Sequence, residues 1–244
     1  MAKVILFDLD GTLLPMDTDK FVETYIKELA GRVSHIVHPD TFVEALWGGT
    51  KSMMTNIDPE KTNEQVFEEN FLKMADLDKD KIWPVLDDFY ETVFPTFSYL
   101  CQPTPLGRKV VEEAIKQGYR VAVATNPVFP KSAIYHRLSW AGLNNIPFEL
   151  VTVYEESHFT KPHPQYYRHI SEKLGVQPEE CVMAGNDKQE DMAAEKAGMK
   201  TFLVKGCVID RGTTDYRVDD EGTLQDLYTK ISEQQGLFRS SSAD

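Results

Sequence analysis

Two carboxylates stand at the end of an apolar run near the start of the chain. The run VILF at 4–7 consists of strand-forming residues, which is typical of a strand buried on both faces, and Asp8 and Asp10 follow it. Side chains two positions apart on a strand point to the same side, so both acids would face one place. Burying ionised carboxylates is costly, and two of them repel each other. Because Gly11 then supplies a turn, the pattern favours a functional site over an exposed strand end with solvated acids.

Further polar side chains follow three later runs of strand-forming residues. They provide a hydroxyl, an amide, an ammonium group and two carboxylates: Thr125, Asn126, Lys161, Asp187 and Asp191. Each has an ordinary explanation when taken alone, since a threonine can cap a turn, a loop lysine is usually solvated, and acids stabilise a helix N-terminus. Together they place polar groups at the carboxyl ends of four candidate strands, which favours a shared site.

The elements that would position these side chains alternate from about residue 104 to 204. Expected strands lie at 119–125, 148–153, 181–185 and 200–204. Expected helices lie at 105–117, 130–142, 164–175 and 188–198. This alternation predicts an α/β fold, a Rossmann-like parallel sheet with helices on both faces. Ligands of such sheets bind at the carboxyl ends of the strands, where the polar side chains would gather.

The segment between the first strand and the next core strand is long and helical in character. Four stretches with helical patterns carry recurring Trp, Phe and Met residues: 19–31, 38–49, 63–75 and 80–94. A single crossover between strands rarely needs so many residues, so the sequence predicts a helical insertion. Within it, Trp47, Gly48 and Gly49 are either a loop that sets specificity or an ordinary helix stop. The end of the chain, 236–244, is expected to be a frayed tail.

The composition and charge of the chain argue against some classes of binding partner. Its 244 residues are 41% hydrophobic and 27% charged, as in an ordinary globular protein. The net charge of −13 argues against nucleic acid or an anionic membrane as the main partner, although a locally positive pocket could hold a small phosphorylated ligand. Cys101, Cys181 and Cys207 show neither zinc-site spacing nor a disulfide framework, which favours a cytoplasmic setting. No signal peptide or membrane span is expected.

The order of the polar groups resembles the haloacid dehalogenase (HAD) superfamily, whose phosphatases carry four ordered motifs. The matching stretches are, in order, DLDGTLL at 8–14, VAVATN at 121–126, Lys161, and AGNDKQED at 184–191. The resemblance covers roughly 1–15 and 96–210. It implies a core domain formed by 1–15 and 96–235 and a helical cap domain at 16–95, inserted after the first motif.

The resemblance further implies a phosphatase that acts on a small phosphorylated metabolite through an aspartyl-phosphate intermediate. Asp8 would be the nucleophile, and Asp10 would protonate the leaving oxygen and later take a proton from water. Lys161 would stabilise the charge of Asp8 and the phosphate. The Thr125 hydroxyl and the Asn126 backbone N–H would hold the phosphoryl oxygens.

The same resemblance implies a Mg²⁺ cofactor, which would neutralise the nucleophile and the phosphate. Its ligands would be the Asp8 side chain, the Asp10 backbone carbonyl and Asp187, with Asp191 as direct or water-mediated support. Because the fourth motif reads GNDKQED, the first acid of the family could instead align with Asn186, whose amide oxygen can also bind a metal. The four-residue spacing to Asp191 favours Asp187, and Asn186 stays open.

Three other functions deserve comparison with the phosphatase. A phosphomutase of the same superfamily would use the same acids. A non-catalytic protein that binds or senses a phosphorylated ligand is disfavoured, since Asp8, Asp10, Lys161 and Asp187 are all retained. A dehalogenase is disfavoured because Asp10 supplies the proton that an alkoxide leaving group needs. The oligomeric state is left open.

Overall fold

The protein, described here for residues 2–239 by a computed structural model, is built around one sheet of six parallel strands. The strands are β1 (Val4–Phe7), β2 (Arg120–Val123), β3 (Leu150–Val151), β4 (Cys181–Gly185), β5 (Lys200–Lys205) and β6 (Asp220–Thr223). Their order in the sheet is β3-β2-β1-β4-β5-β6, so the chain extends the sheet first to one side of β1 and then to the other. Ligands of α/β sheets bind at the carboxyl ends of the strands where this direction reverses.

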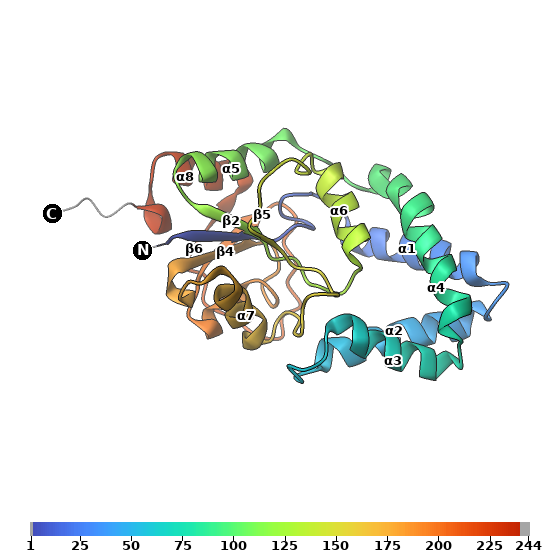
Figure 1. Ribbon diagram of the computed structural model, residues 1–244. Helices are drawn as coiled ribbons and strands as arrows, with labels where there is room; N and C mark the ends of the chain where they lie inside the picture. The colour runs from blue at the N-terminus through green and yellow to red at the C-terminus, as the bar shows by residue number, and fades with distance from the viewer. Residues whose placement is uncertain (1, 240–244) are drawn as a thin grey trace.

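Helices cover both faces of the sheet, as predicted. Figure 1 shows α5 (Pro105–Lys116) and α8 (Leu224–Ser232) on one face and α7 (Pro164–Leu174) on the other. Alternate residues of β1 point to opposite faces of the sheet. Ile5 and Phe7 belong to the cluster beneath α5 and α8, whereas Val4 and Leu6 pack with α7. The central strand is therefore buried on both sides, and the predicted fold class is confirmed.

The segment at 18–100, between β1 and α5, is mostly helical and contains no strand. It contains α1 (Thr18–Val33), α2 (Pro39–Thr55), α3 (Asn63–Ala75), α4 (Lys79–Asp88), a π-helical stretch η1 (Phe89–Val93) and a 3₁₀ stretch η2 (Phe94–Leu100). The starts of its helices are well capped: Asp17 accepts from the Lys20 N–H, and Thr62 forms a capping box with Gln65. Figure 1 shows these helices beyond the ends of the strands, to the right. The division into domains at 15/16 and 95/96 stays a prediction.

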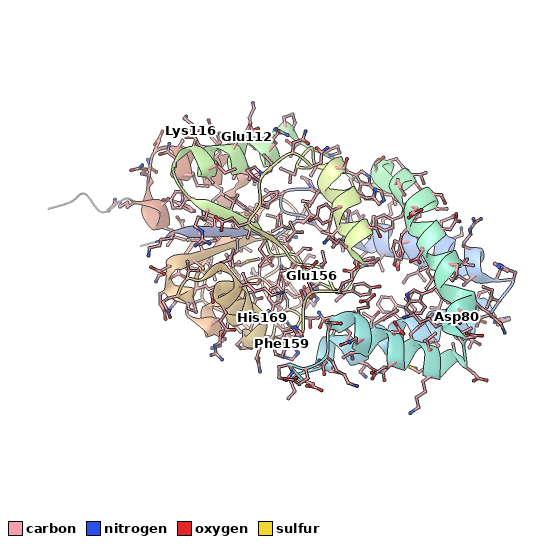
Figure 2. The ribbon with its side chains drawn as sticks, viewed as in Figure 1. Asp80, Glu112, Lys116, Glu156, Phe159 and His169 are labelled. Atoms are coloured by element: carbon pink, nitrogen blue, oxygen red, sulfur yellow. The ribbon has the colours of Figure 1, made fainter. Side chains whose placement is uncertain are left out.

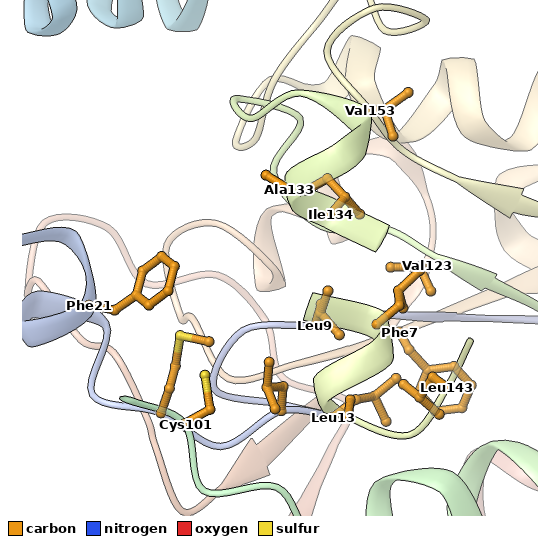
Figure 3. Packing of buried hydrophobic residues seen from close by; sticks show 14 of the residues in the cluster. Phe7, Leu9, Leu13, Phe21, Cys101, Val123, Ala133, Ile134, Leu143 and Val153 are labelled. Carbon is orange, nitrogen blue, oxygen red and sulfur yellow. The ribbon is translucent and has the colours of Figure 1, made fainter. Parts of the chain in front are cut away.

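The hydrophobic core continues from the sheet into the inserted helices. Phe7 of β1 packs in one cluster with Leu9 and Leu13 of the next turn, and the cluster reaches Phe21 of α1 and Cys101 (Figure 3). All of these side chains are buried. The helical segment is thus anchored on the turn that carries Asp10.

The glycine pair in the insertion is neither a loop nor a helix stop. Trp47, Gly48 and Gly49 lie inside α2, which continues past them. A Cβ atom at Gly48 would come within 2.3 Å of the Met74 side chain, and one at Gly49 within 3.0 Å of the Phe67 ring. The glycines therefore let α2 and α3 pack closely, and this tertiary contact outweighs the low helix propensity of glycine.

Two expected elements are shorter than the sequence suggests. In place of a helix over 188–198 there is a turn followed by the 3₁₀ helix η4 (Met192–Ala197). The Asp187 carboxylate accepts the N–H groups of Gln189 (2.9 Å) and Glu190 (2.8 Å), and such side-chain bonds compete with regular helix formation. The expected strand at 148–153 is reduced to β3, because β3 is an edge strand and the Tyr154 N–H turns to the Phe129 carbonyl.

The chain beyond 204 carries elements that the sequence analysis did not predict. Strand β6 and helix α8 complete the sheet domain. The 3₁₀ helix η5 (Gly236–Phe238) follows, and its Phe238 is buried and accepts the Tyr119 hydroxyl at 2.8 Å. The expected frayed tail is thus packed at 236–238, while its last five positions, 240–244, lie outside the described residues. Within residues 2–239, no helix is long and apolar enough to cross a membrane.

Candidate active site

Lys161 joins two carboxylates at the carboxyl end of the central strand. Its side chain is buried, and Nζ lies 2.9 Å from Asp8 Oδ1 and 2.5 Å from Asp191 Oδ1. The other Asp8 oxygen accepts the Thr12 hydroxyl at 3.1 Å. Burial alone would lower the pKa of Lys161, but Asp191 and Asp8 raise it well above its ordinary value. Lys161 is therefore a fixed positive charge that holds Asp8 in place.

Asp191 is the most deeply buried acid of this group. Burial and the nearby Asp8 charge raise the pKa of Asp191 to about 8, against the opposing effect of Lys161. Its second oxygen accepts the Asp187 N–H at 2.8 Å. Gly185 makes room for it, since a Cβ atom there would lie 2.1 Å from Asp191 Oδ2. Two buried carboxylates thus share one ammonium group, and the raised pKa of Asp191 reflects the cost of charging both of them.

Asp10 faces a different partner from Asp8. Its carboxylate forms an ion pair with the guanidinium of Arg137, which is buried on α6 (Lys131–Trp140) and lies 4.4 Å from the centre of the Phe129 ring. Burial raises the pKa of Asp10, although Arg137 opposes the shift. Asp10 Oδ1 and Arg137 Nη2 are both buried with no hydrogen-bond partner among the described residues. One acceptor and one donor are therefore free beside the cavity.

The end of β2 is tied to the loops that carry the charged groups. The Thr125 carbonyl accepts the hydroxyls of Thr152 (2.6 Å) and Tyr166 (2.8 Å). Asn126 accepts the Lys161 N–H at 3.2 Å and donates to Glu190 Oε2 at 3.1 Å. These bonds fix the position of Thr125 and Asn126 relative to Lys161.

Asn186 and Asp187 point to different partners. Asn186 Oδ1 accepts the Thr12 hydroxyl at 2.9 Å, and the same hydroxyl contacts Asp8. Gly11, at φ +81°, passes so close that a Cβ atom would lie 2.3 Å from Asn186 Nδ2. Asp187 instead pairs with Arg211, whose Nη1 lies 2.9 and 2.7 Å from its two carboxylate oxygens. Asn186 is therefore linked to Asp8 through one hydroxyl, whereas Asp187 is engaged with a cation.

All residues that the sequence singled out for chemistry meet at one cavity. Its volume is about 750 Å³, and it lies between the sheet edge and the helical insertion. The sequence-predicted residues that line it are Asp8, Asp10, Thr125, Asn126, Lys161, Asn186, Asp187 and Asp191. The roles assigned to them stay predictions.

Three charged residues at the sheet end of this cavity were not predicted from the sequence. They are Arg137, Glu190 and Arg211. Burial, followed by the charge of Asp187, raises the pKa of Glu190. A lone arginine in a helix or a loop is ordinary in sequence, and Arg137 meets Asp10 only because the fold brings together positions 127 residues apart. Glu190 lies within the fourth motif, AGNDKQED, and this position is the one feature of the sequence that could have indicated it.

A hard cation fits the charge of this site. In the described part of the chain, no three His, Cys, Asp or Glu side chains are grouped so as to hold a metal. Mg²⁺ needs fewer protein ligands, since it keeps several waters. The Asp8 charge raises the pKa of the buried Asp191, and a bound cation would relieve this repulsion and favour the charged form of both carboxylates. Asp187 would have to exchange Arg211 for the metal.

The comparisons with known proteins agree with this arrangement. A family model described as haloacid dehalogenase-like hydrolase matches residues 5–204. A pyrophosphatase, PpaX, from Bacillus mycoides (strain KBAB4) is 23% identical over 233 residues, which cover 93% of this chain and 97% of that protein.

Solved structures that share the fold include a phosphatase and a dehalogenase. A HAD phosphatase from Thermococcus onnurineus has a TM-score of 0.60 at 24% identity and covers 95% of this chain and 98% of its own. An L-2-haloacid dehalogenase from Xanthobacter autotrophicus, with chloropropionic acid covalently bound, has a TM-score of 0.58 at 16% identity, with coverage of 96% and 100%. These likenesses show the same fold around different reactions. Because the family model spans most of the chain and the motif residues meet in one cavity, the chain belongs to the haloacid dehalogenase-like hydrolases.

Proposed function

We propose that the chain is a Mg²⁺-dependent phosphatase that hydrolyses a small phosphorylated metabolite through an aspartyl-phosphate. The observation that carries the proposal is the buried Lys161 ammonium group, 2.9 Å from Asp8 at the end of the central strand. A carboxylate oriented by a fixed cation is suited to attack an anionic phosphorus centre. The Bacillus relatives named pyrophosphatase and the Thermococcus phosphatase support phosphate chemistry.

The reaction has two displacements at phosphorus. An Asp8 oxygen attacks phosphorus, the bond to the leaving alcohol breaks, and Asp10 gives that oxygen its proton. Asp10 then takes a proton from water, the water oxygen attacks phosphorus, and the bond to Asp8 breaks to release phosphate. The raised pKa of Asp10 suits a group that must first carry a proton and then recover it.

The remaining residues hold the charged group during both steps. The Thr125 hydroxyl and the Asn126 backbone N–H would bind phosphoryl oxygens, and Lys161 would balance their charge. Mg²⁺, when bound, would neutralise the nucleophile and the phosphate. It would be held by Asp8, the Asp10 carbonyl and a residue after β4.

Two residues compete for the last position in the metal site. The sequence favours Asp187, with Asp191 as direct or water-mediated support. The shared Thr12 hydroxyl now favours Asn186, because it lies 2.9 Å from Asn186 Oδ1 and 3.1 Å from Asp8. Magnesium titration separates them: loss of a ligand raises the half-saturating concentration by about 10-fold or more. Asp187→Asn should leave that concentration nearly unchanged if Asn186 is the ligand.

The helical segment would act as the cap over this site. Residues 16–95 would close one side of the cavity, with the core formed by 1–15 and 96–235. The three cysteines are free thiols, which supports the expected cytoplasmic setting.

Phosphate release from a panel of phosphorylated sugars, acids and alcohols with Mg²⁺ tests the proposal. Release from at least one ester, abolished by a chelator and restored by Mg²⁺, is the expected result. Ca²⁺ should inhibit, since it takes more ligands and would draw both Asp8 oxygens into coordination. Conversion of a sugar phosphate to its isomer without phosphate release, followed by phosphorus NMR, would identify a phosphomutase instead. Neither product from any ester would favour a non-catalytic binding protein and overturn the proposal.

A further inference from the structure

The cavity has two ends of different chemical character. At the sheet end lie the cationic side chains of Lys161, Arg137 and Arg211. The opposite walls come from the helical insertion and are largely apolar, with aliphatic side chains between the rings of Tyr25, Phe42, Trp47, Phe67, Phe71, Trp83 and Tyr90. Figure 2 shows the side chains of the inserted helices around the space between them and the sheet domain. A phosphate group in this cavity would therefore lie at the cationic sheet end. The alcohol part of the ester would then reach the walls that carry the rings.

The aromatic walls are held by packing between rings. Phe67 stacks on Phe71 with ring centres 5.3 Å apart, and Phe71 meets Trp83 edge-on at 6.2 Å. On the other side, the hydroxyls of Tyr25 and Tyr90 lie 2.6 Å apart. Rings fixed in this way form a preorganised surface for a flat apolar group and lose little freedom when it binds.

Carboxylates lie beside these walls and would repel a substrate that carries an anionic group in addition to its phosphate ester. Glu64, Asp87 and Glu155 line the cavity on this side. Burial, then the neighbouring Glu68 and Asp87, raises the pKa of Glu64, and burial raises the pKa of Glu155. The one lysine among the cap residues that line the cavity, Lys79, forms a salt bridge with Glu68 at 2.7 Å. A leaving group with its own phosphate or carboxylate would meet like charges here.

We infer that the substrate is a phosphate monoester of an uncharged alcohol with an aromatic or similarly flat apolar body. The inference rests on the proposed phosphatase function and adds the class of leaving group. A cavity of about 750 Å³ is in the range of pockets that enclose whole organic ligands, whereas a bare pyrophosphate would leave the rings without contact. The leaving group of this chain thus differs from the one that the name of its Bacillus relatives suggests.

Esters with similar leaving groups test the inference. Ethyl phosphate and 2-naphthylmethyl phosphate both release a primary alkoxide and differ mainly in the ring. The naphthyl ester should have a kcat/KM at least about 100-fold above those of ethyl phosphate and pyrophosphate, because only it contacts the rings. An equal or higher kcat/KM for ethyl phosphate or pyrophosphate would overturn the inference and leave the phosphatase function intact.

A matched pair of variants locates the effect. Trp47 lines the cavity yet is 51% exposed, so Trp47→Ala should fold and should lower the naphthyl-to-ethyl ratio about 10-fold. Tyr99 is 70% exposed and lies outside the residues that line the cavity, so Tyr99→Ala should keep the wild-type ratio. An unchanged ratio in Trp47→Ala, or an equal fall in both variants, would contradict the assigned wall.

Binding without turnover separates this inference from the proposed function. The non-hydrolysable 2-naphthylmethyl phosphonate should bind the wild-type protein with Mg²⁺ at least about 10-fold more tightly than ethyl phosphonate, measured by calorimetry. If it does so while no ester is hydrolysed, the inference on the ligand stands and the phosphatase function fails. If both phosphonates bind equally, the inference fails whatever the protein hydrolyses.

Discussion

At the carboxyl ends of the strands, ion pairs hold the charged side chains in place. Across the cavity, the walls from the inserted helices are held by packing between aromatic rings. Lys161 serves two carboxylates at once, and Arg137 and Arg211 each pair with an aspartate. The opposite walls hold their shape through aromatic contacts. Electrostatic contacts depend on the identity of single atoms, while packing depends on volume and shape. Substitutions at the edge should therefore change the rate, and substitutions in the helical walls should change stability or substrate preference.

Asp8→Asn should have the largest effect on rate. The amide cannot form the acyl-phosphate, so turnover of any ester should fall by at least about 10⁴-fold. Stability should be kept, because Lys161 retains Asp191 at 2.5 Å and the repulsion between Asp8 and Asp191 is removed. Steady-state phosphate release and urea unfolding of the same preparation would measure both. Residual turnover above one part in a thousand with an intact fold would show that another group attacks phosphorus.

Asp10→Asn should separate the two chemical steps. Loss of a general acid–base group costs about 10²–10⁴-fold in rate. A nitrophenyl ester needs little protonation of its leaving group, so this variant should still form aspartyl-phosphate from it and then stall. A burst of nitrophenolate equal to the enzyme concentration, followed by slow turnover, is the expected trace in a stopped-flow experiment. Wild-type rates on both nitrophenyl and alkyl esters would remove Asp10 from the mechanism.

Arg137→Met should have a smaller effect, which depends on Asp10. The change leaves the Asp10 carboxylate buried without its partner, so both stability and proton transfer should suffer, the rate by about 10-fold. A double-mutant cycle measures the coupling. In the Asp10→Asn background, Arg137→Met should cost little further rate. An equal loss in both backgrounds would mean that Arg137 acts on the substrate directly and not through Asp10.

The same contrast explains what the sequence could predict. Asp8 and Asp10 stand out because an apolar strand and two acids are adjacent in the chain, and the alternation of elements predicts the sheet that places Thr125 and Lys161 nearby. The partner of Asp187 could not be found this way, because Arg211 lies 24 positions away with no local pattern. Pairings between distant charged side chains are decided by the folded geometry.

Local rules failed where tertiary packing decides. Gly48 and Gly49 have the composition of a helix stop, yet α2 continues through them because α3 packs against it there. The helix expected after β4 gave way to a turn, since the Asp187 side chain captures two backbone N–H groups. In both places a few specific side-chain contacts outweigh the average preference of the residues.

The two glycines of α2 give the smallest and most local test of the contrast. Alanine has a helix propensity about 1 kcal/mol better than that of glycine, so each substitution gains that much unless the new methyl group collides. At Gly48 the collision is with the end of the Met74 side chain, which is 49% exposed and free to swing away. Gly48→Ala should therefore leave the free energy of unfolding unchanged or raise it by up to about 1 kcal/mol.

At Gly49 the methyl group meets the Phe67 ring and the Phe67 carbonyl oxygen, at 3.0 and 3.2 Å. That ring is stacked on Phe71 and cannot yield without disturbing the wall, so Gly49→Ala should lower the free energy of unfolding by about 1–2 kcal/mol. Urea unfolding measures the difference between the two variants, and turnover of ethyl phosphate should stay within about twofold in both, since neither glycine lines the cavity. If Gly48→Ala proved the more costly change, Met74 would be fixed in the wall, and the helical side of the cavity would be more rigid than its exposure indicates. If both variants lost turnover of ethyl phosphate while remaining folded, the separation between a chemical edge and a packed wall would fail.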